Sequence, residues 1–302
     1  DFSATYTSVF TPERSGDIAF EFVTGVIVRR NVDGKEVKGI KNNNGSRKGT
    51  EEMTVEAGKS YDIQLEFDYH KSDAQLNFDL GYKEDIDLKK TVAKVKDASI
   101  VIFVGGISPS LEGEEMGVNL PGFKRGDRTD IELPAVQREL IKALHDAGKK
   151  VILVNCSGSP IGFEPEMKTC EAILQAWYPG QSGGKAVADV LFGEYNPAGR
   201  LPVTFYRNVT QLPDFEDYNM TGRTYRYMKA EPLFPFGYGL SYTTFEYGKP
   251  KLSAAEIAAD GTLSVTVPVK NTGKYDGDEI VQVYLKKQGE DNGPIKTLRA
   301  FK

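Results

Sequence analysis

The chain has 302 residues, of which 39% are hydrophobic and 27% charged, and its formal net charge is −5. A chain of this length can hold more than one domain, since domains typically contain about 100 to 200 residues. Lysines and arginines are interleaved with acidic residues throughout, which excludes the concentrated basic face of a nucleic-acid-binding protein. No apolar run reaches the roughly 20 residues that span a bilayer, and no signal-peptide pattern follows Asp1. We therefore expect no membrane span.

Residues 1–84 read as an all-β domain. Alternating apolar and polar residues predict strands at 2–10, 18–23 and 61–67. Turn signals such as Asp33-Gly34 separate the strands. This pattern is typical of an antiparallel β-sandwich.

Residues 85–245 change to an α/β pattern. A short helix with Leu88 and Val92 on one face precedes an apolar strand at 99–104. We then predict an amphipathic helix over 133–147, an apolar strand at 151–154, a third strand at 172–177 and a helix over 183–192, in that order. Apolar strands that alternate with helices indicate a mostly parallel sheet covered on both faces.

Residues 246–302 return to the period of two that is typical of strands. Strands are predicted at 263–267 and 280–285, on either side of a turn near Asn271. Too few strands are present for a closed sandwich of about seven. We therefore expect a truncated third domain, so that the fold class is α/β and all-β, multidomain.

The few cysteines and histidines argue against a disulfide scaffold, a metal site and histidine-dependent catalysis. Cys156 and Cys170 are too few for a disulfide scaffold and lack metal-ligand spacing, so they are interpreted as buried thiols. His70 and His145 are the only histidines, so a histidine-dependent triad or a multi-histidine metal site has few residues available. We expect no metal and no cofactor, and acid–base chemistry must fall to carboxylates.

Such carboxylates gather in the segment between the strand at 99–104 and the helix at 133–147. Glu112, Glu114 and Glu115 precede an Asp127-Arg128 pair. The segment follows the carboxyl end of a parallel strand, where α/β sheets usually place ligand sites. Clustered carboxylates can keep one acid protonated, whereas an arginine lowers the pKa of another. The alternative is a solvated acidic loop, which composition alone favours.

Two long motifs resemble a known family. Residues 177–205, WYPGQSGGKAVADVLFG followed by NPAGRLPVTF, resemble the C-terminal α/β-sandwich domain of family 3 glycoside hydrolases. Residues 223–227 and 232–245, RTYRY and PLFPFGYGLSYTTF, resemble that family's link into a fibronectin-III-like domain. Core and linker roles are expected for the motif residues themselves, including Trp177 and the Gly183-Gly184 pair.

The first domain resembles part of a PA14 module, which some members of the family insert into the α/β domain. Residues 32–37, VDGKEV, carry this likeness. The acidic pair that usually precedes this hairpin is replaced by residues 22–26, FVTGV. Calcium-dependent sugar binding is therefore not expected of this module.

The resemblance assigns roles in the carboxylate loop. The family's acid/base glutamate lies in a Glu-x-Glu stretch upstream of an Asp-Arg pair, which selects Glu114, with Glu112 and Glu115 as alternatives. Asp127 and Arg128 would hold the loop by an ion pair or bind a sugar hydroxyl. The family's nucleophile is an aspartate on a (β/α)8 barrel, so no nucleophile is expected in this chain.

The resemblance implies a function and a partner. The chain would be the acid/base-carrying portion of a retaining exo-β-glucosidase or β-xylosidase that acts on plant-type oligosaccharides. It would be inactive until the enzyme's own barrel completes the site. The family implies a periplasmic or secreted location. The alternative is a non-catalytic carbohydrate-binding or scaffolding protein.

Overall fold

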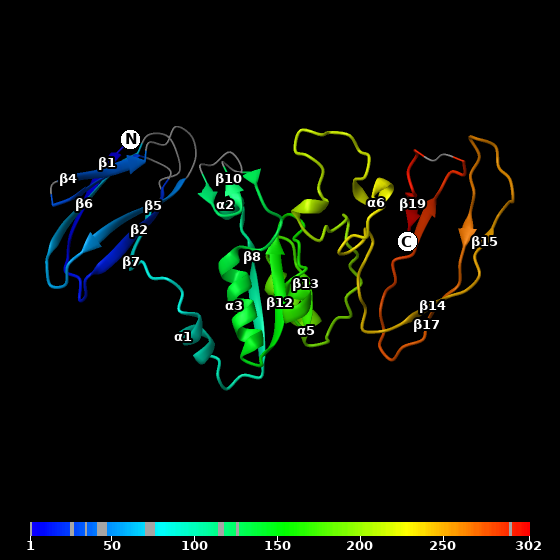
Figure 1. The fold of residues 1–302 in the computed structure, drawn as a ribbon, viewed down its shortest axis with the longest axis horizontal. Helices are drawn as coiled ribbons and strands as arrows, with labels where there is room; N and C mark the ends of the chain where they lie inside the picture. Colours follow the sequence, from blue (N-terminus) through cyan, green and yellow to red (C-terminus); the bar gives the residue numbers. More distant parts are fainter. Residues whose placement is uncertain are drawn as a thin grey trace. The chain divides into compact units, whose positions relative to one another are not determined.

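In the computed structural model the chain forms two compact units, Asp1–Ile86 and Asp87–Lys302 (Figure 1). The structure describes residues 2–24, 27–33, 35–40, 47–69, 76–113, 118–124, 127–289 and 292–302. Each unit has its own hydrophobic core. The boundary expected between residues 245 and 246 stays a prediction.

Unit 1 consists of two antiparallel sheets. One has the strand order β1-β6-β3-β4 and the other β5-β2-β7. The strands are β1 (Phe2–Phe10), β2 (Gly16–Thr24), β3 (Ile27–Val32), β4 (Lys35–Ile40), β5 (Arg47–Val55), β6 (Tyr61–Tyr69) and β7 (Leu76–Tyr82).

The alternation in β6 explains the core of unit 1. Tyr61, Ile63, Leu65 and Phe67 are all buried, and they pack with Phe20 of β2. The apolar side chains of a strand at every second position point to one face, so burying that face fixes the register. The predicted strand at 61–67 is confirmed.

Unit 2 combines a parallel sheet with helices and short strand pairs. Its helices are α1 (Leu88–Ala93), α2 (Pro109–Glu112), α3 (Ala135–Asp146), α4 (Glu166–Thr169), α5 (Gly183–Leu191), the 3₁₀ turn η1 (Val209–Gln211) and α6 (Thr224–Tyr227). Its strands are β8 (Ile100–Ile107), β9 (Asn119–Leu120), β10 (Phe123–Lys124), β11 (Asp127–Arg128), β12 (Lys150–Ser157), β13 (Ala172–Gln175), β14 (Phe245–Tyr247), β15 (Lys251–Leu252), β16 (Val265–Thr266), β17 (Val269–Asn271), β18 (Gln282–Leu285) and β19 (Thr297–Phe301).

The parallel sheet has the order β13-β12-β8, with β12 in the centre. Helix α3 crosses one face of it (Figure 1), and its Ile141 and Leu144 are buried with Val151 and Leu153 of β12. A mixed α/β fold with a parallel sheet was predicted from the apolar strands, and it is confirmed. The fully apolar strand pattern arises because β12 is covered on both faces: Val154, which points away from α3, is 1% exposed.

The motif residues take structural positions. Trp177 packs edge-on against the buried ring of Phe205 at a centroid distance of 6.0 Å. A Cβ atom on Gly183 would lie 2.3 Å from the Pro179 side chain, so this glycine allows the turn before α5 to pack closely. The core role expected for Trp177 agrees with this packing.

Candidate functional site

The carboxyl end of β8 is fixed by a glutamine from α3. Gln137 Nε2 donates to the Gly106 carbonyl at 2.8 Å, and the Gly106 N–H donates to Gln137 Oε1 at 2.9 Å. Gly106 has a φ of +132°, and a Cβ atom there would lie 2.1 Å from the Cys156 carbonyl oxygen. Only glycine therefore lets β8 and β12 approach this closely. The loop that follows starts from a rigid strand end.

Helix α2 is a single capped turn directly after β8. Ser108 Oγ accepts a hydrogen bond from the Leu111 N–H at 3.2 Å, which caps the turn at its start. Gly113 ends the turn with a φ of +67° and donates to the Pro109 carbonyl. These caps place half-buried Glu112 on a defined turn beyond the end of the parallel sheet.

Tyr178 joins this turn to the sheet. Its hydroxyl lies 3.0 Å from the Ile107 carbonyl oxygen and 3.1 Å from Glu112 Oε2, so one phenolic proton serves two acceptors. Burial raises the pKa of Tyr178, and the hydrogen bond to Glu112 raises it further. A Cβ atom on Gly158 would lie 2.5 Å from the Tyr178 ring, so the ring rests directly on that backbone.

The backbone before Tyr178 is strained. Trp177 has a φ of +56°, a left-handed conformation that is unfavourable for a large side chain. The conformation persists because Trp177 packs on Phe205 and Tyr178 binds the Glu112 turn. The unusual backbone at Trp177 thus lets two adjacent side chains reach different partners: Trp177 contacts Phe205, and Tyr178 binds Glu112.

Arg128 is the cation of this site. Nη1 donates to Ser159 Oγ at 3.0 Å and Nη2 donates to the Glu132 carbonyl at 3.0 Å. Its Nε atom is buried and has no hydrogen-bond partner among the described residues. Burial lowers the pKa of Arg128, and the negative charge of Glu112 opposes this most strongly. The guanidinium is thus tied to neutral groups while it faces a carboxylate.

The structure brings together some of the predicted site residues. Glu112 and Arg128 interact electrostatically at the end of the sheet, as their pattern in the sequence suggested. Asp127 is exposed, and its backbone lies opposite that of Lys124 in the antiparallel pair of β11 and β10. No ion pair joins Asp127 to Arg128 among the described residues. Arg128 donates hydrogen bonds to neutral groups, and the role expected of Asp127 and Arg128 in holding the loop stays a prediction. Glu114 and Glu115 lie outside the described residues.

Sequence reasoning missed a polar network beside this loop. Asn155 of β12 is fully buried, and its Nδ2 donates to Ser157 Oγ at 2.8 Å and to Gln175 Oε1 at 2.7 Å. Its Oδ1 atom is buried without a partner among the described residues. The signal was an asparagine in an otherwise apolar strand, VILVNCS. Tyr178 and Gln137 carried no comparable signal, because their partners are distant in the sequence.

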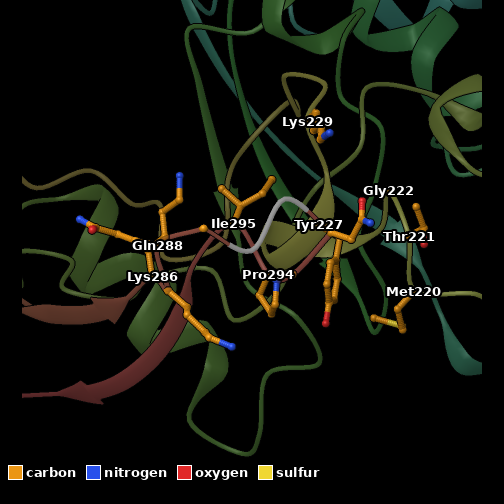
Figure 2. Close-up of a pocket in the computed structure, with 13 residues that line it drawn as sticks. Met220, Thr221, Gly222, Tyr227, Lys229, Lys286, Gln288, Pro294 and Ile295 are labelled. Carbon is orange, nitrogen blue, oxygen red and sulfur yellow. The ribbon is translucent and has the colours of Figure 1, made fainter.

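Unit 2 also has an open pocket of about 690 Å³. In Figure 2 Lys286 and Gln288 lie on one side of it and Met220 and Thr221 on the other, with Tyr227 and Pro294 between them. The described lining residues come from 220–229 and 286–295 and include no carboxylate. This pocket therefore lacks the acid that the carboxylate loop provides.

Neither a metal cluster nor a membrane-spanning helix is found among the described residues. Across the described ranges no group of histidine, cysteine, aspartate and glutamate side chains is arranged to hold a metal ion. Cys156 and Cys170 are free and half-buried, and burial raises the pKa of Cys170 to about 11. No helix in the described part of the chain is both long and apolar enough to cross a bilayer.

The chain is similar to known proteins over its whole length. Residues 13–242 match the model of the glycosyl hydrolase family 3 C-terminal domain. A xylan 1,4-beta-xylosidase from Xylanibacter ruminicola is 51% identical over 306 residues, which cover 100% of this chain and 35% of the relative. A beta-glucosidase from Rhizobium radiobacter is 34% identical, covering 100% of this chain and 40% of the relative.

Solved structures agree with these sequence matches. A crystal structure of a beta-glucosidase from Kluyveromyces marxianus has a TM-score of 0.73 and 27% identity, and the alignment covers 99% of this chain and 37% of that one. The chain thus spans about a third of the length of the relatives that it matches across its whole extent.

Proposed function

The chain belongs to glycoside hydrolase family 3, through the C-terminal domain of that family, and we propose that it carries the acid/base group of a retaining exo-β-glycosidase. The enzyme would be a β-xylosidase or a β-glucosidase that hydrolyses O-glycosidic bonds of plant-type oligosaccharides. Relatives that match the whole chain carry both of these names.

The observation that supports the proposal is the anchoring of the glutamate-bearing turn. Tyr178 and the charge of Arg128 hold Glu112 at the carboxyl end of β8, and the two other glutamates follow within three residues. Glycoside cleavage needs a carboxyl group that can reach the departing oxygen reproducibly. A turn fixed at both ends and bound to the sheet can meet that requirement, whereas a solvated loop cannot.

Glu114 is our choice for the acid/base, and Glu112 and Glu115 are the alternatives. An acid catalyst must hold its proton near neutrality, which neighbouring carboxylates favour and a nearby arginine opposes. Glu112 shares its environment with Arg128 and accepts a hydrogen bond from Tyr178, which suits a group that orders the loop. Arg128, and Asp127 at the exposed rim, would then hold the loop or contact a sugar hydroxyl.

The nucleophile would come from a barrel domain of the same enzyme. In a retaining glycosidase the two carboxyl groups lie about 5 Å apart, so the nucleophile must approach the loop from its solvent side. On this proposal the isolated chain does not turn over substrate. The barrel, supplied in the same polypeptide or separately, would complete the site.

The finer domain division is part of the same proposal. Residues 1–84 would be a PA14-like β-sandwich, 85–245 the α/β-sandwich domain and 246–302 a fibronectin-III-like domain. Two stacked antiparallel sheets in unit 1 and the antiparallel pair β18-β19 support it. A periplasmic beta-glucosidase from Salmonella typhimurium is 38% identical over 227 residues, which supports a periplasmic or secreted location.

The test uses a chimera in which this chain replaces the matched region of the Xylanibacter ruminicola xylosidase. Glu114→Ala should slow hydrolysis of xylo-oligosaccharides by about a hundredfold or more, because proton delivery typically contributes a factor of about 10² to 10⁴. Aryl glycosides with good leaving groups should be spared, and added azide should restore turnover. Glu112→Ala and Glu115→Ala are measured in parallel, with Glu139→Ala on the exposed face of α3 as the matched control.

The result separates the candidates. Azide rescue in one of the three loop variants identifies the acid/base. If all three keep normal turnover of natural substrates, the loop has no catalytic role. Titrating the chain alone with xylo- and gluco-oligosaccharides tests the alternative, a carbohydrate-binding or scaffolding protein, which would bind sugar without any barrel.

A further inference from the structure

Two polar residues near the end of β12 have fully buried side chains. Asn155 and Ser157 are both 0% exposed, although the strand is apolar from Val151 to Val154. Asn155 Nδ2 donates to Ser157 Oγ at 2.8 Å and to Gln175 Oε1 at 2.7 Å. Its Oδ1 atom has no partner among the described residues, so burying this amide costs free energy that an apolar side chain would not. We therefore expect the amide to serve the geometry of its surroundings more than their stability.

The hydroxyl of Ser157 links Asn155 to the loop that follows β12, residues 157–160, which we call the β12 loop. Ser157 Oγ accepts from Asn155 and donates to the Ser159 carbonyl at 2.9 Å. The backbone of the β12 loop is thereby tied to a buried side chain of the sheet. Linked hydrogen bonds of this kind make a buried region rigid when their members are paired.

Both groups that act on Glu112 lie against the β12 loop. Arg128 Nη1 donates to Ser159 Oγ at 3.0 Å. The ring of Tyr178 rests on Gly158, whose backbone also forms a hydrogen bond with the Tyr178 oxygen. Tyr178 binds Glu112 at 3.1 Å, and the charge of Glu112 acts on Arg128. The β12 loop therefore supports both contacts of this glutamate.

We propose that Asn155 and Ser157 are positioning residues for the turn that leads into the acid/base stretch. Both side chains are fully buried, so they act through other residues and not on the sugar. They fix the β12 loop, which supports Arg128 and Tyr178, and these two hold Glu112 beyond the end of β8. A catalytic group must be held within about 0.5 Å of its productive place. The role assigned to Asn155 and Ser157 rests on the proposed function, because the loop glutamates must act on the sugar for their placement to matter.

A purely structural role for the two residues makes a different prediction. If they only stabilise unit 2, their removal reduces the amount of folded enzyme and slows every substrate equally. A positioning role slows the substrates whose departing oxygen needs a proton from the acid. Aryl glycosides with good leaving groups need little proton transfer, so the ratio of the two rates separates the roles.

The first measurement is hydrogen exchange in the whole chain. Ser157→Ala removes the hydroxyl that links the strand to the β12 loop, and Asn155→Leu replaces the amide by an apolar group of similar size. Exchange at the Leu111 and Gly113 amides should become about fivefold faster in both variants, since each loses at least one supporting hydrogen bond. Circular dichroism checks that the variants fold. Ser157→Ala is the milder change and keeps the test decisive if Asn155→Leu does not fold.

The second measurement uses the chimera with the Xylanibacter ruminicola xylosidase. In both variants kcat/KM for xylo-oligosaccharides should fall about tenfold, because a displaced acid delivers its proton less often. For aryl xylosides with good leaving groups, kcat/KM should stay within about twofold of the unaltered chimera.

Thr243→Val provides the matched control. Thr243 is 7% exposed, and its hydroxyl donates to Asn271 Oδ1 at 2.7 Å, so this variant also loses one hydrogen bond of a buried residue in unit 2. It should change neither the exchange of the α2 amides nor the ratio of the two rates.

The two proposals fail in different ways. Unchanged exchange in α2 in Ser157→Ala, or an equal loss with both kinds of substrate, overturns the positioning role and leaves the acid/base proposal intact. Normal turnover of natural substrates in Glu112→Ala, Glu114→Ala and Glu115→Ala overturns the acid/base proposal, and the positioning role falls with it even if exchange in α2 is faster.

Discussion

Two arginines of unit 2 differ in how their charge is balanced. Arg200 donates to Glu279 Oε2 at 2.6 Å, and the other oxygen of that carboxylate accepts from the Tyr247 hydroxyl at 2.6 Å. The side chains of Arg200 and Glu279 are 12% and 18% exposed, respectively. Arg128, by contrast, binds a hydroxyl and backbone carbonyls, and its Nε atom lacks a partner among the described residues.

The difference separates an arginine that has a carboxylate partner from an arginine that binds only neutral groups. The guanidinium of Arg200 binds the carboxylate of Glu279, and that carboxylate also binds the hydroxyl of Tyr247. The charges of this cluster are therefore balanced within the chain. Arg128 has an Nε donor without a partner among the described residues, and it lies near Glu112 beyond the end of the parallel sheet. An incomplete site of this kind is stable only because surrounding packing holds it.

The largest expected effect comes from breaking the complete cluster. Glu279→Ala leaves Arg200 nearly buried without its carboxylate, so the free energy of unfolding should fall by about 3 kcal/mol. Urea unfolding followed by the fluorescence of Trp177, the single tryptophan, measures this in unit 2. Glu246→Ala, at an exposed position of β14, is the control. A loss below about 0.5 kcal/mol would show that the pair adds little.

The second prediction concerns Arg128 itself. Arg128→Lys keeps the charge but cannot bind Ser159 and the Glu132 carbonyl together, because it lacks the planar fork of arginine. In the chimera kcat/KM should fall about tenfold, which corresponds to about 1.4 kcal/mol. Arg200→Lys should lower stability and leave kcat/KM unchanged. Equal losses of kcat/KM in both variants would contradict the distinction between the two arginines.

A smaller effect is expected at Tyr178. Tyr178→Phe removes the hydroxyl that binds Ile107 and Glu112, and one such hydrogen bond stabilises a protein by about 1 kcal/mol. Hydrogen exchange at the Leu111 and Gly113 amides should become faster, while exchange in β12 stays unchanged. Tyr218→Phe, at a position that is 86% exposed, should change neither. Unchanged exchange in α2 would exclude Tyr178 as its anchor.

The smallest effect is a pH dependence at Tyr247. Burial, together with the hydrogen bond to Glu279, raises its pKa from 10.0 to about 12. Between these values the folded chain holds a proton that the unfolded chain has lost, so stability falls as pH rises. Tyr247→Phe should flatten this part of the pH profile in urea unfolding. Tyr275→Phe, 62% exposed, should leave the profile unchanged. A profile that stays equally steep in Tyr247→Phe would assign the effect to another group.

The local pattern predicted most regular elements of the sheet layers. The strand expected at 99–104 is β8, and the helix expected over 133–147 is α3, which ends one residue earlier. Both have a clear period of hydrophobic residues, so burial of one face fixes them. Strands β5 and β7 were not predicted, because polar residues such as Glu52 and Asp79 hide their alternation and only pairing with β2 defines them.

The site was predictable only where its residues are close in sequence. The glutamates stand out in a loop after an apolar strand, and so does the Asp127-Arg128 pair. Tyr178 contacts Glu112 across 66 positions, and Gln137 contacts Gly106 across 31. The period of the hydrophobic residues gives no information about such a pair. Each of the two residues lies in a segment whose own pattern is ordinary, so nothing in the sequence links them.

By itself, the sequence determined the family, the strand–helix alternation and the position of the acidic loop, because hydrophobic period and motif are local properties of the chain. The tertiary structure decided which side chains complete that loop. These depend on how strands lie beside one another, and the chain encodes that arrangement only through the summed packing of its core.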